Sequence, residues 1–240
     1  MNPADRVIVA LDTPDSTRAL ALADALAGRA AWLKVGMTLL YSVGPSIVGS
    51  LRERGFEVFV DLKLHDIPHQ VRGAAGELAA LGCSMLTVHA SGGRDMVASA
   101  VEGARAGALR AGQAAPLVVA VTVLTSLDDA ALAETGVESG AAVQAARLAD
   151  LAREAGADGV VCSPWEASAM RALLGPSAEI VTPGVRLPGE AAGDQARVAT
   201  PARALAEGAS RIVVGRPVTD AADPAIAFDE IVTALRGDRE

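Results

Sequence analysis

Aromatic side chains are scarce in this chain, since Phe, Trp and Tyr together make up 2% of its 240 residues. Proteins that bind single-stranded nucleic acid stack the bases on such side chains, so the scarcity argues against that role. Positive charge is also in short supply, with 21 Lys and Arg against 29 Asp and Glu and a net charge of −8. This charge opposes binding to nucleic acids or anionic membranes. A small anionic ligand is still compatible with it, because a local cluster of cations can hold one.

Cysteine is also scarce, and long apolar runs are missing. Cys83 and Cys162 are the only cysteines, and their apolar neighbours indicate buried hydrophobic residues, with a single disulfide as the less favoured alternative. No stretch approaches the roughly 18 apolar residues of a membrane span, and residues 1–11 do not resemble a signal peptide. No Gly-x-Gly-x-x-Gly or Walker-type loop occurs, which argues against a nucleotide cofactor. We therefore expect a cytoplasmic protein that binds neither membrane nor nucleic acid.

The chain instead shows a regular alternation of short β-prone runs and Ala-rich helical stretches. The predicted strands are Val7–Leu11, Ala31–Val35, Glu57–Asp61, Met85–His89, Leu117–Val123, Gly159–Cys162, Glu179–Thr182 and Arg211–Val214. The predicted helices include Ser16–Leu26, Pro45–Arg54, Val71–Leu81, Asp95–Gly107, Val143–Ala155, Ala167–Leu174 and Pro201–Glu207. Residues 130–140 are expected as a local insertion, and no linker marks a second domain. Eight strand–helix units predict an α/β fold, a (β/α)₈ TIM barrel forming a single domain over residues 1–240, with a doubly wound open sheet as the alternative.

Polar residues end or follow most of the predicted strands. They are Asp12, Lys34, Asp61, Lys63, His89, Thr125, Ser126, Arg186 and Arg216, the last directly after Gly215. In a barrel all strands end at one rim, and active sites lie there. So many hydrophilic groups from different strands predict a functional site on that rim.

The densest group of charges lies in the segment Asp61–Asp66, directly after the apolar run Val58–Val60. Side chains alternate along a strand, so Asp61 and Lys63 should face the same side, while Asp66 lies past the strand. Charges at the end of a buried strand are costly unless they are paired, which favours a functional cluster. From these residues alone, a structural ion-pair network is an equal alternative.

Two loops predict a phosphate site. Residues 182–189 form a Gly/Pro-rich loop that contains Arg186, with Gln195 a few residues later, and Gly215-Arg216 follow the last strand. Barrels often bind phosphate between the loops after strands seven and eight. Glycine allows the backbone to approach closely, and Arg donates two parallel hydrogen bonds. Taken singly, Gly215 and Arg216 are equally compatible with a turn and a solvated charge.

A metal site is less well supported. His65 and His69 are four residues apart, with carboxylates nearby, as metal ligands on one helical turn would be. However, Pro68 lies between them, and the Lys63 ammonium would repel a divalent cation. We therefore expect no metal, and His89 is expected to be structural or to line the pocket wall.

Together these motifs resemble the bacterial orotidine 5′-phosphate decarboxylase family, over nearly the whole chain. The resemblance is carried by Val9-Ala10-Leu11-Asp12, Leu33-Lys34-Val35-Gly36, Phe59-Val60-Asp61-Leu62-Lys63-Leu64-His65-Asp66-Ile67-Pro68, Val88-His89-Ala90, Leu124-Thr125-Ser126, Val181-Thr182-Pro183-Gly184-Val185-Arg186, Gly193-Asp194-Gln195 and Val214-Gly215-Arg216-Pro217. It implies a homodimeric carboxy-lyase of UMP biosynthesis that converts orotidine 5′-monophosphate to uridine 5′-monophosphate and CO₂ without metal or organic cofactor.

The resemblance also implies roles for individual residues. Lys34, Asp61, Lys63 and Asp66 match the family's catalytic Lys-Asp-Lys-Asp array, in which the last Asp crosses from the partner subunit. The implied substrate-binding positions are Asp12 and Lys34 for ribose, Thr125 for the pyrimidine, and Arg186, Gln195, Gly215 and Arg216 for the phosphate side. Ile67 and Gln70 are implied as further contacts. Many relatives have Asn-Thr where this chain has His69-Gln70, so the ribose contact of that Thr is in question at Gln70.

These roles imply a mechanism. Loss of CO₂ leaves an electron pair on C6 of the pyrimidine, which the Lys63 ammonium stabilises and then protonates. Asp61 and Asp66 should favour the charged form of Lys63. Two alternatives stay open: a magnesium-dependent sugar-phosphate decarboxylase or aldolase of the same superfamily, and a non-catalytic barrel that binds a phosphate ligand. The first is disfavoured by the segment 65–68 and by Thr125-Ser126, and the second by retention of the whole charged array.

Overall fold

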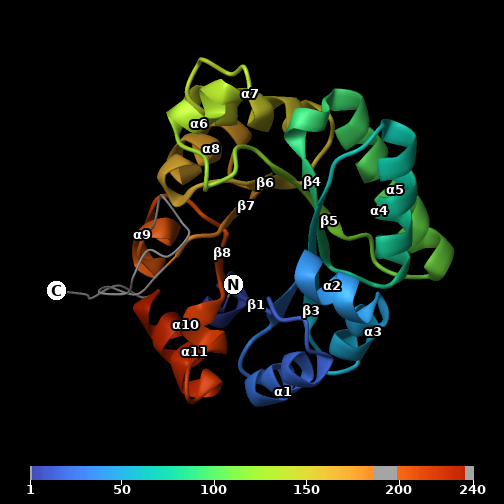
Figure 1. Ribbon diagram of the computed structural model, residues 1–240, viewed down its shortest axis with the longest axis vertical. Helices are drawn as coiled ribbons and strands as arrows, with labels where there is room; N and C mark the ends of the chain where they lie inside the picture. Colours follow the sequence, from blue (N-terminus) through green and yellow to red (C-terminus); the bar gives the residue numbers. More distant parts are fainter. Residues whose placement is uncertain (1, 186–198, 236–240) are drawn as a thin grey trace.

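Eight parallel strands form a closed barrel in this computed structural model, which describes residues 2–185 and 199–235. The strands are β1 (Val7–Ala10), β2 (Trp32–Gly36), β3 (Glu57–Leu64), β4 (Met85–His89), β5 (Leu117–Val121), β6 (Gly159–Val161), β7 (Glu179–Thr182) and β8 (Arg211–Val214). They follow one another in sequence order, and β8 pairs with β1 to close the ring (Figure 1). The predicted (β/α)₈ barrel is therefore confirmed, and the open sheet is excluded because its edge strands would not pair with each other.

All eight predicted strands are present, and their ends agree to within three residues. Strands buried on both faces are continuous apolar runs, which is why the Val-rich segments predicted them well. The largest difference is in β3, which continues to Leu64 instead of ending at Asp61. Leu62 and Leu64 pack outward against the helix layer. Asp61 and Lys63 are therefore part of β3 itself.

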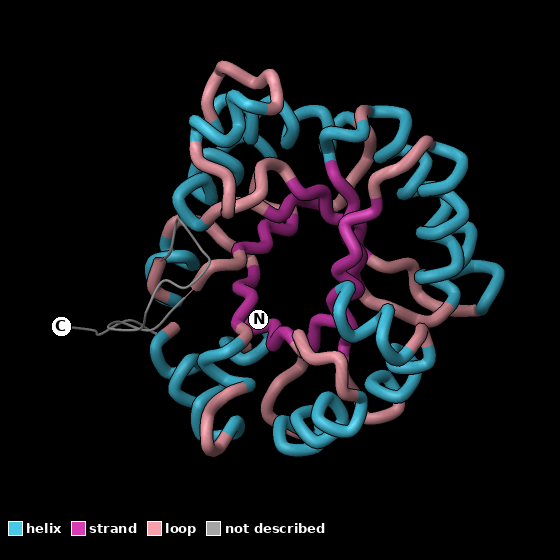
Figure 2. The backbone as a smooth tube through the Cα atoms, in the orientation of Figure 1, coloured by secondary structure: helices cyan, strands magenta, loops and turns pink. Residues whose placement is uncertain are grey.

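Helices surround the barrel as an outer layer (Figure 2). They are α1 (Ser16–Leu26), α2 (Met37–Val43), α3 (Ser46–Arg52), α4 (Pro68–Ala80), α5 (Arg94–Ala111), α6 (Asp129–Glu134), α7 (Ala141–Glu154), α8 (Ala167–Leu174), α9 (Pro201–Ala206), α10 (Arg216–Thr219) and α11 (Pro224–Ala234). The sequence did not predict α2, α6, α10 or α11. Helix α6 forms within the expected insertion because Asp128 caps it, accepting a hydrogen bond from the Ala131 N–H at 2.8 Å. Within the described residues, no helix has the length and apolarity needed to cross a membrane.

Alternation along the strands divides the buried side chains between two layers. The barrel interior holds Ile8, Ala10, Trp32, Phe59, Met85, Val119, Val181 and Val213. A much larger cluster fills the space between the strands and the helices. Its many Ala residues, together with glycines on the helices, let the helices lie close together. At Gly103 and Gly107 of α5 an added Cβ would overlap the carbonyl oxygens of Arg72 and Gly76 on α4, so these two backbones are in contact.

A buried ion pair closes the amino-terminal end of the barrel. Glu179, the first residue of β7, pairs with Arg211, the first residue of β8. The Arg211 guanidinium lies 4.5 Å from the centroid of the Trp32 ring, at the start of β2, in a cation–π contact. The side chains of Arg211 and Glu179 are only 10% and 13% exposed, so this end of the interior is sealed.

Candidate active site

A cavity of about 970 Å³ opens at the carboxyl ends of the strands, the rim where the sequence predicted a site. Its lining includes Asp12, Lys34, Asp61, Lys63, Thr125, Ser126, Gly215 and Arg216. These residues come from the ends of β1, β2, β3, β5 and β8. The predicted convergence on one rim is confirmed for them, and the cavity has the size of known small-molecule sites.

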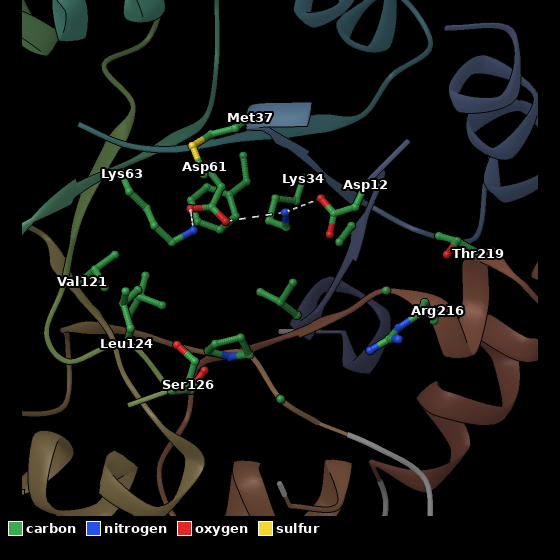
Figure 3. A pocket seen from close by; sticks show the side chains of 18 of the residues that line it. Asp12, Lys34, Met37, Asp61, Lys63, Val121, Leu124, Ser126, Arg216 and Thr219 are labelled. Atoms are coloured by element: carbon green, nitrogen blue, oxygen red, sulfur yellow. Dashed lines mark hydrogen bonds and ion pairs between the residues drawn. The ribbon is translucent and has the colours of Figure 1, made fainter. Parts of the chain in front are cut away.

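Four charged side chains form a chain along one wall of this cavity (Figure 3). The Lys63 Nζ lies 2.9 Å from the Asp61 Oδ1, and the Asp61 Oδ2 lies 3.5 Å from the Lys34 Nζ. The Lys34 Nζ in turn lies 2.8 Å from the Asp12 Oδ1. Positive and negative groups therefore alternate, so each charge at the rim has an opposite charge beside it.

Burial makes this pairing necessary. The side chains of Lys34 and Asp61 are 9% and 13% exposed, whereas that of Asp12 is 59% exposed. Burial alone would raise the pKa of the Asp61 carboxyl. The ammonium groups of Lys34 and Lys63, with hydrogen bonds from Lys63 and Thr87, instead hold that pKa below its ordinary value. Asp61 is therefore an anion held between two cations.

Lys34 and Lys63 are the only two lysines in the whole sequence, where every other basic side chain besides three histidines is arginine. The sequence analysis named both as site residues but did not note that the chain has no other lysine. Arginine stays protonated in proteins, whereas lysine can release its proton. Both lysines of the chain lie in the cavity wall.

The backbone around Lys63 departs from a regular strand. Val60 pairs with Leu86 of β4, and the next pair is Leu64 with Val88, so four steps along β3 match two along β4. Lys63 has φ of 53°, the one positive φ outside glycine among the described residues. A side chain in this left-handed region costs roughly 1–3 kcal/mol. Asp61 and Lys63 nevertheless both face the cavity, as alternation predicted, and their side chains pair there.

Two residues that the sequence analysis did not name as site residues shape this wall. The Thr87 hydroxyl, from β4, accepts a hydrogen bond from the Lys63 N–H and donates one to the Asp61 carboxylate. At Gly36, the end of β2, an added Cβ would lie 2.8 Å from the Asp12 Oδ1 and 3.1 Å from the Lys34 Nζ. Glycine there leaves room for the Asp12–Lys34 pair. Thr87 was visible in the sequence only as a polar residue within an otherwise apolar strand.

The predicted phosphate side lies across the cavity from Lys63. Figure 3 shows Arg216 beside Thr219, at the opposite end of the view from Lys63. Arg216 begins α10 directly after Gly215, and both line the cavity. Arg18 of α1, which was not predicted, also lines this end and donates hydrogen bonds to Asp220 at 2.8 Å and to the Thr219 carbonyl at 3.3 Å. The predicted Arg186 and Gln195 lie outside the described residues.

The remaining predicted residues are not brought into the same cavity. Asp66, Ile67 and Gln70 are exposed and absent from its lining. The Asp66 Oδ1 accepts a hydrogen bond from the Ile67 N–H at 2.6 Å, and Ile67 is 62% exposed, although its side chain is apolar. The fourth member of the implied Lys-Asp-Lys-Asp array therefore stands apart from the other three within one subunit.

The histidines lie beside the charged wall. The rings of His65 and His89 are 5.3 Å apart between centroids. Burial lowers the pKa of His89, and the positive potential of His65 and Lys63 lowers it further. Among the described residues, no three His, Cys, Asp or Glu side chains come together as metal ligands would.

Comparison with known proteins identifies the family to which this architecture belongs. Residues 5–231 match the family model described as "Orotidine 5'-phosphate decarboxylase / HUMPS family". The chain belongs to this family. The description of this family names two groups of proteins. Individually named relatives therefore help to distinguish between the two groups.

Relatives named orotidine 5′-phosphate decarboxylase are similar to this chain over nearly its whole length. The protein of that name from Moorella thermoacetica is 51% identical over 98% of this chain and 94% of its own. The one from Anaeromyxobacter sp. (strain K) is 50% identical over 98% of this chain and all of its own. The crystal structure of orotidine 5′-phosphate decarboxylase from Lactobacillus acidophilus superimposes with a TM-score of 0.86 at 39% identity, covering 97% of this chain and 100% of that one.

Proposed function

We propose that this protein is an orotidine 5′-phosphate decarboxylase, which converts orotidine 5′-monophosphate to uridine 5′-monophosphate and CO₂ in pyrimidine biosynthesis. The observation that carries the proposal is the chain of charges from Lys63 to Asp12 along a cavity with Arg216 at its far end. The names of the relatives at about half identity support the choice of substrate. The names of these relatives favour neither of the two alternative functions.

In this proposal each part of the substrate has its own contacts in the cavity. The phosphate lies against Gly215 and the Arg216 guanidinium, where a bidentate contact is strongest. The ribose hydroxyls reach Asp12 and Lys34, and the pyrimidine lies between Thr125 and Lys63. This orientation places C6 and its carboxylate next to the Lys63 ammonium, away from the phosphate.

The chemistry follows from the charges at that end. The bond between C6 and the carboxylate breaks, CO₂ departs, and the electron pair stays on C6. The Lys63 ammonium stabilises this charge, then transfers a proton from Nζ to C6 and regains one from water. Asp61 holds the ammonium in place at 2.9 Å and disfavours the substrate carboxylate through like charge. Because Lys63 supplies both the field and the proton, the scheme uses no metal or organic cofactor.

We further propose that the active enzyme is a homodimer in which Asp66 enters the partner's cavity. The support is that Asp66 is exposed, lies outside its own cavity and adjoins the exposed apolar side chain of Ile67. A second copy seated on this segment would bury Ile67 and complete the partner's Lys-Asp-Lys-Asp array. Gln70, in the first turn of α4, would then face the partner's ribose site.

The direct test is loss of orotidine 5′-monophosphate absorbance with purified protein, with and without EDTA. We expect conversion to uridine 5′-monophosphate at a rate that EDTA does not change. Absence of turnover by folded protein, together with magnesium-dependent turnover of a sugar phosphate, would overturn the proposal in favour of the related sugar-phosphate enzymes.

A further inference from the structure

Thr87 connects β4 to the charged segment of β3 from inside the barrel. It is 1% exposed and does not line the cavity, so it lies behind the site and does not touch the space that a substrate would fill. Its hydroxyl oxygen accepts a hydrogen bond from the Lys63 N–H at 2.8 Å. Its hydroxyl hydrogen is donated to the Asp61 Oδ1 at 3.0 Å. One buried hydroxyl group thus binds both the backbone of Lys63 and the carboxylate that pairs with the Lys63 ammonium.

The first of these bonds stabilises an unfavourable backbone. Lys63 adopts φ of 53°, which side chains with a Cβ disfavour. The regular pairing of β3 with β4 is interrupted between Val60 and Leu64, so the Lys63 N–H lies in the unpaired stretch. A buried N–H needs an acceptor, and the Thr87 hydroxyl provides it. The hydroxyl group therefore replaces a strand partner for the Lys63 N–H within this interrupted stretch.

The second bond fixes the partner of the ammonium. The Asp61 Oδ1 receives both the Thr87 hydroxyl and the Lys63 Nζ, at 3.0 Å and 2.9 Å. The contacts close a ring that runs from the Lys63 backbone through Thr87 and Asp61 to the Lys63 ammonium. In such a ring the ammonium is positioned relative to its own backbone by a residue of the neighbouring strand.

We propose that Thr87 is a positioning residue, whose hydroxyl group holds the left-handed turn at Lys63 and the orientation of Asp61 and thereby places the Lys63 ammonium for proton delivery. The catalytic part of this inference rests on the proposed decarboxylase function. The geometric part concerns only Lys63, Asp61 and Thr87 and is tested without turnover.

The test uses Thr87→Val, which keeps the volume and removes both hydrogen bonds, and Thr87→Ser, which keeps the hydroxyl. Thr122→Val is the matched control, because Thr122 is also buried and its hydroxyl donates only to the Val161 carbonyl, at 3.2 Å. We expect Thr87→Val to lower kcat about a hundredfold, as misplacement of a reacting group does. The KM should change less than about threefold, since the ribose and phosphate contacts are untouched. Thr87→Ser should restore kcat, and Thr122→Val should leave it unchanged.

The chain's two lysines allow a second readout that needs no substrate. Protein labelled with ¹³C at the lysine Cε should give two lysine side-chain signals, from Lys34 and Lys63. Thr87→Val should shift the Lys63 signal, assigned by its loss in Lys63→Arg, and Thr122→Val should not. If Thr87→Val does not fold, Thr87→Ala replaces it, with the same expected results.

The outcomes separate the two proposals. Wild-type kcat and an unmoved Lys63 signal in folded Thr87→Val would overturn the positioning role, as would an equal loss of kcat in Thr122→Val. Wild-type protein that does not turn over orotidine 5′-monophosphate would overturn the proposed function and the catalytic part of this role. The Lys63 signal would then still decide whether Thr87 sets the position of the ammonium.

Discussion

The two ends of the barrel interior both contain buried charge, but they use it differently. At the amino-terminal end Glu179 and Arg211 form a single pair that is packed beneath the Trp32 ring and sealed. At the carboxyl end four charges alternate along the wall of an open cavity, and both cations there are lysines. In barrels the first end serves stability and the second serves function. The comparison teaches that the arrangement differs: at one end a single arginine pairs with one carboxylate beside an aromatic ring, and at the other two lysines alternate with two carboxylates along the cavity wall.

The largest expected effect comes from substitution of Lys63, at the carboxyl end of the barrel. Lys63→Ala should lower kcat by about 10⁴-fold or more, because the charge that stabilises the intermediate and the proton that quenches it are lost together. Lys63→Arg keeps a positive charge but not a transferable proton, so it should recover little of that loss. Steady-state kinetics measures both variants, and circular dichroism should show a folded barrel in each. Near-normal turnover in folded Lys63→Ala would mean that another group protonates C6.

A smaller effect is expected at the phosphate side. Arg216→Ala should raise the KM about ten- to a hundredfold, the range for losing a hydrogen bond to a charged group. Arg110→Ala is the control, since Arg110 pairs only with the exposed Glu77 on the outer helices. Calorimetry with uridine 5′-monophosphate would show the same ratio. Unchanged affinity in Arg216→Ala would place the phosphate elsewhere.

The amino-terminal end should respond in stability and not in rate. Arg211→Met leaves the buried Glu179 carboxylate unpaired, which costs about 3–5 kcal/mol in comparable sites. The Tm should therefore fall by roughly 10 °C for a chain of this size, while kcat at a permissive temperature stays near the wild-type value. Arg211→Met combined with Glu179→Leu should regain most of the lost Tm. If kcat fell together with the Tm, the assignment of stability to the amino-terminal end and of catalysis to the carboxyl end would be contradicted.

The smallest expected effect comes from substitution of Gly36, beside the Asp12–Lys34 pair at the carboxyl end of the barrel. Gly36→Ala places a methyl group 2.8 Å from the Asp12 Oδ1, and this exposed carboxylate can move aside at little cost in stability. The move would take Asp12 away from Lys34 and from the ribose. We expect a severalfold higher KM with a Tm within about 2 °C of wild type. A large fall in Tm would instead mean that the glycine is required for packing.

Most of the fold was predictable because parallel strands are buried on both faces and appear as apolar runs. The helices that were missed are short or begin in loops, such as α2 directly after Gly36 and α10 directly after Gly215. The predicted residues that line the cavity follow strand ends, so topology brings them together. Thr87 and Gly36 could not be assigned a role, because their roles depend on contacts between neighbouring strands. The bulge at Lys63 could not be predicted for the same reason. No local sequence pattern predicted the Glu179–Arg211 pair.

The most direct test of the account mixes two inactive proteins, Lys63→Ala and Asp66→Ala. If each cavity combines Lys63 of one subunit with Asp66 of the other, half of the randomly mixed dimers are hybrids, and each hybrid has one intact site. We expect about a quarter of the wild-type specific activity to return on subunit exchange, and none when the variants are mixed without exchange. No recovery in verified heterodimers would contradict a shared site built around the Lys63 array.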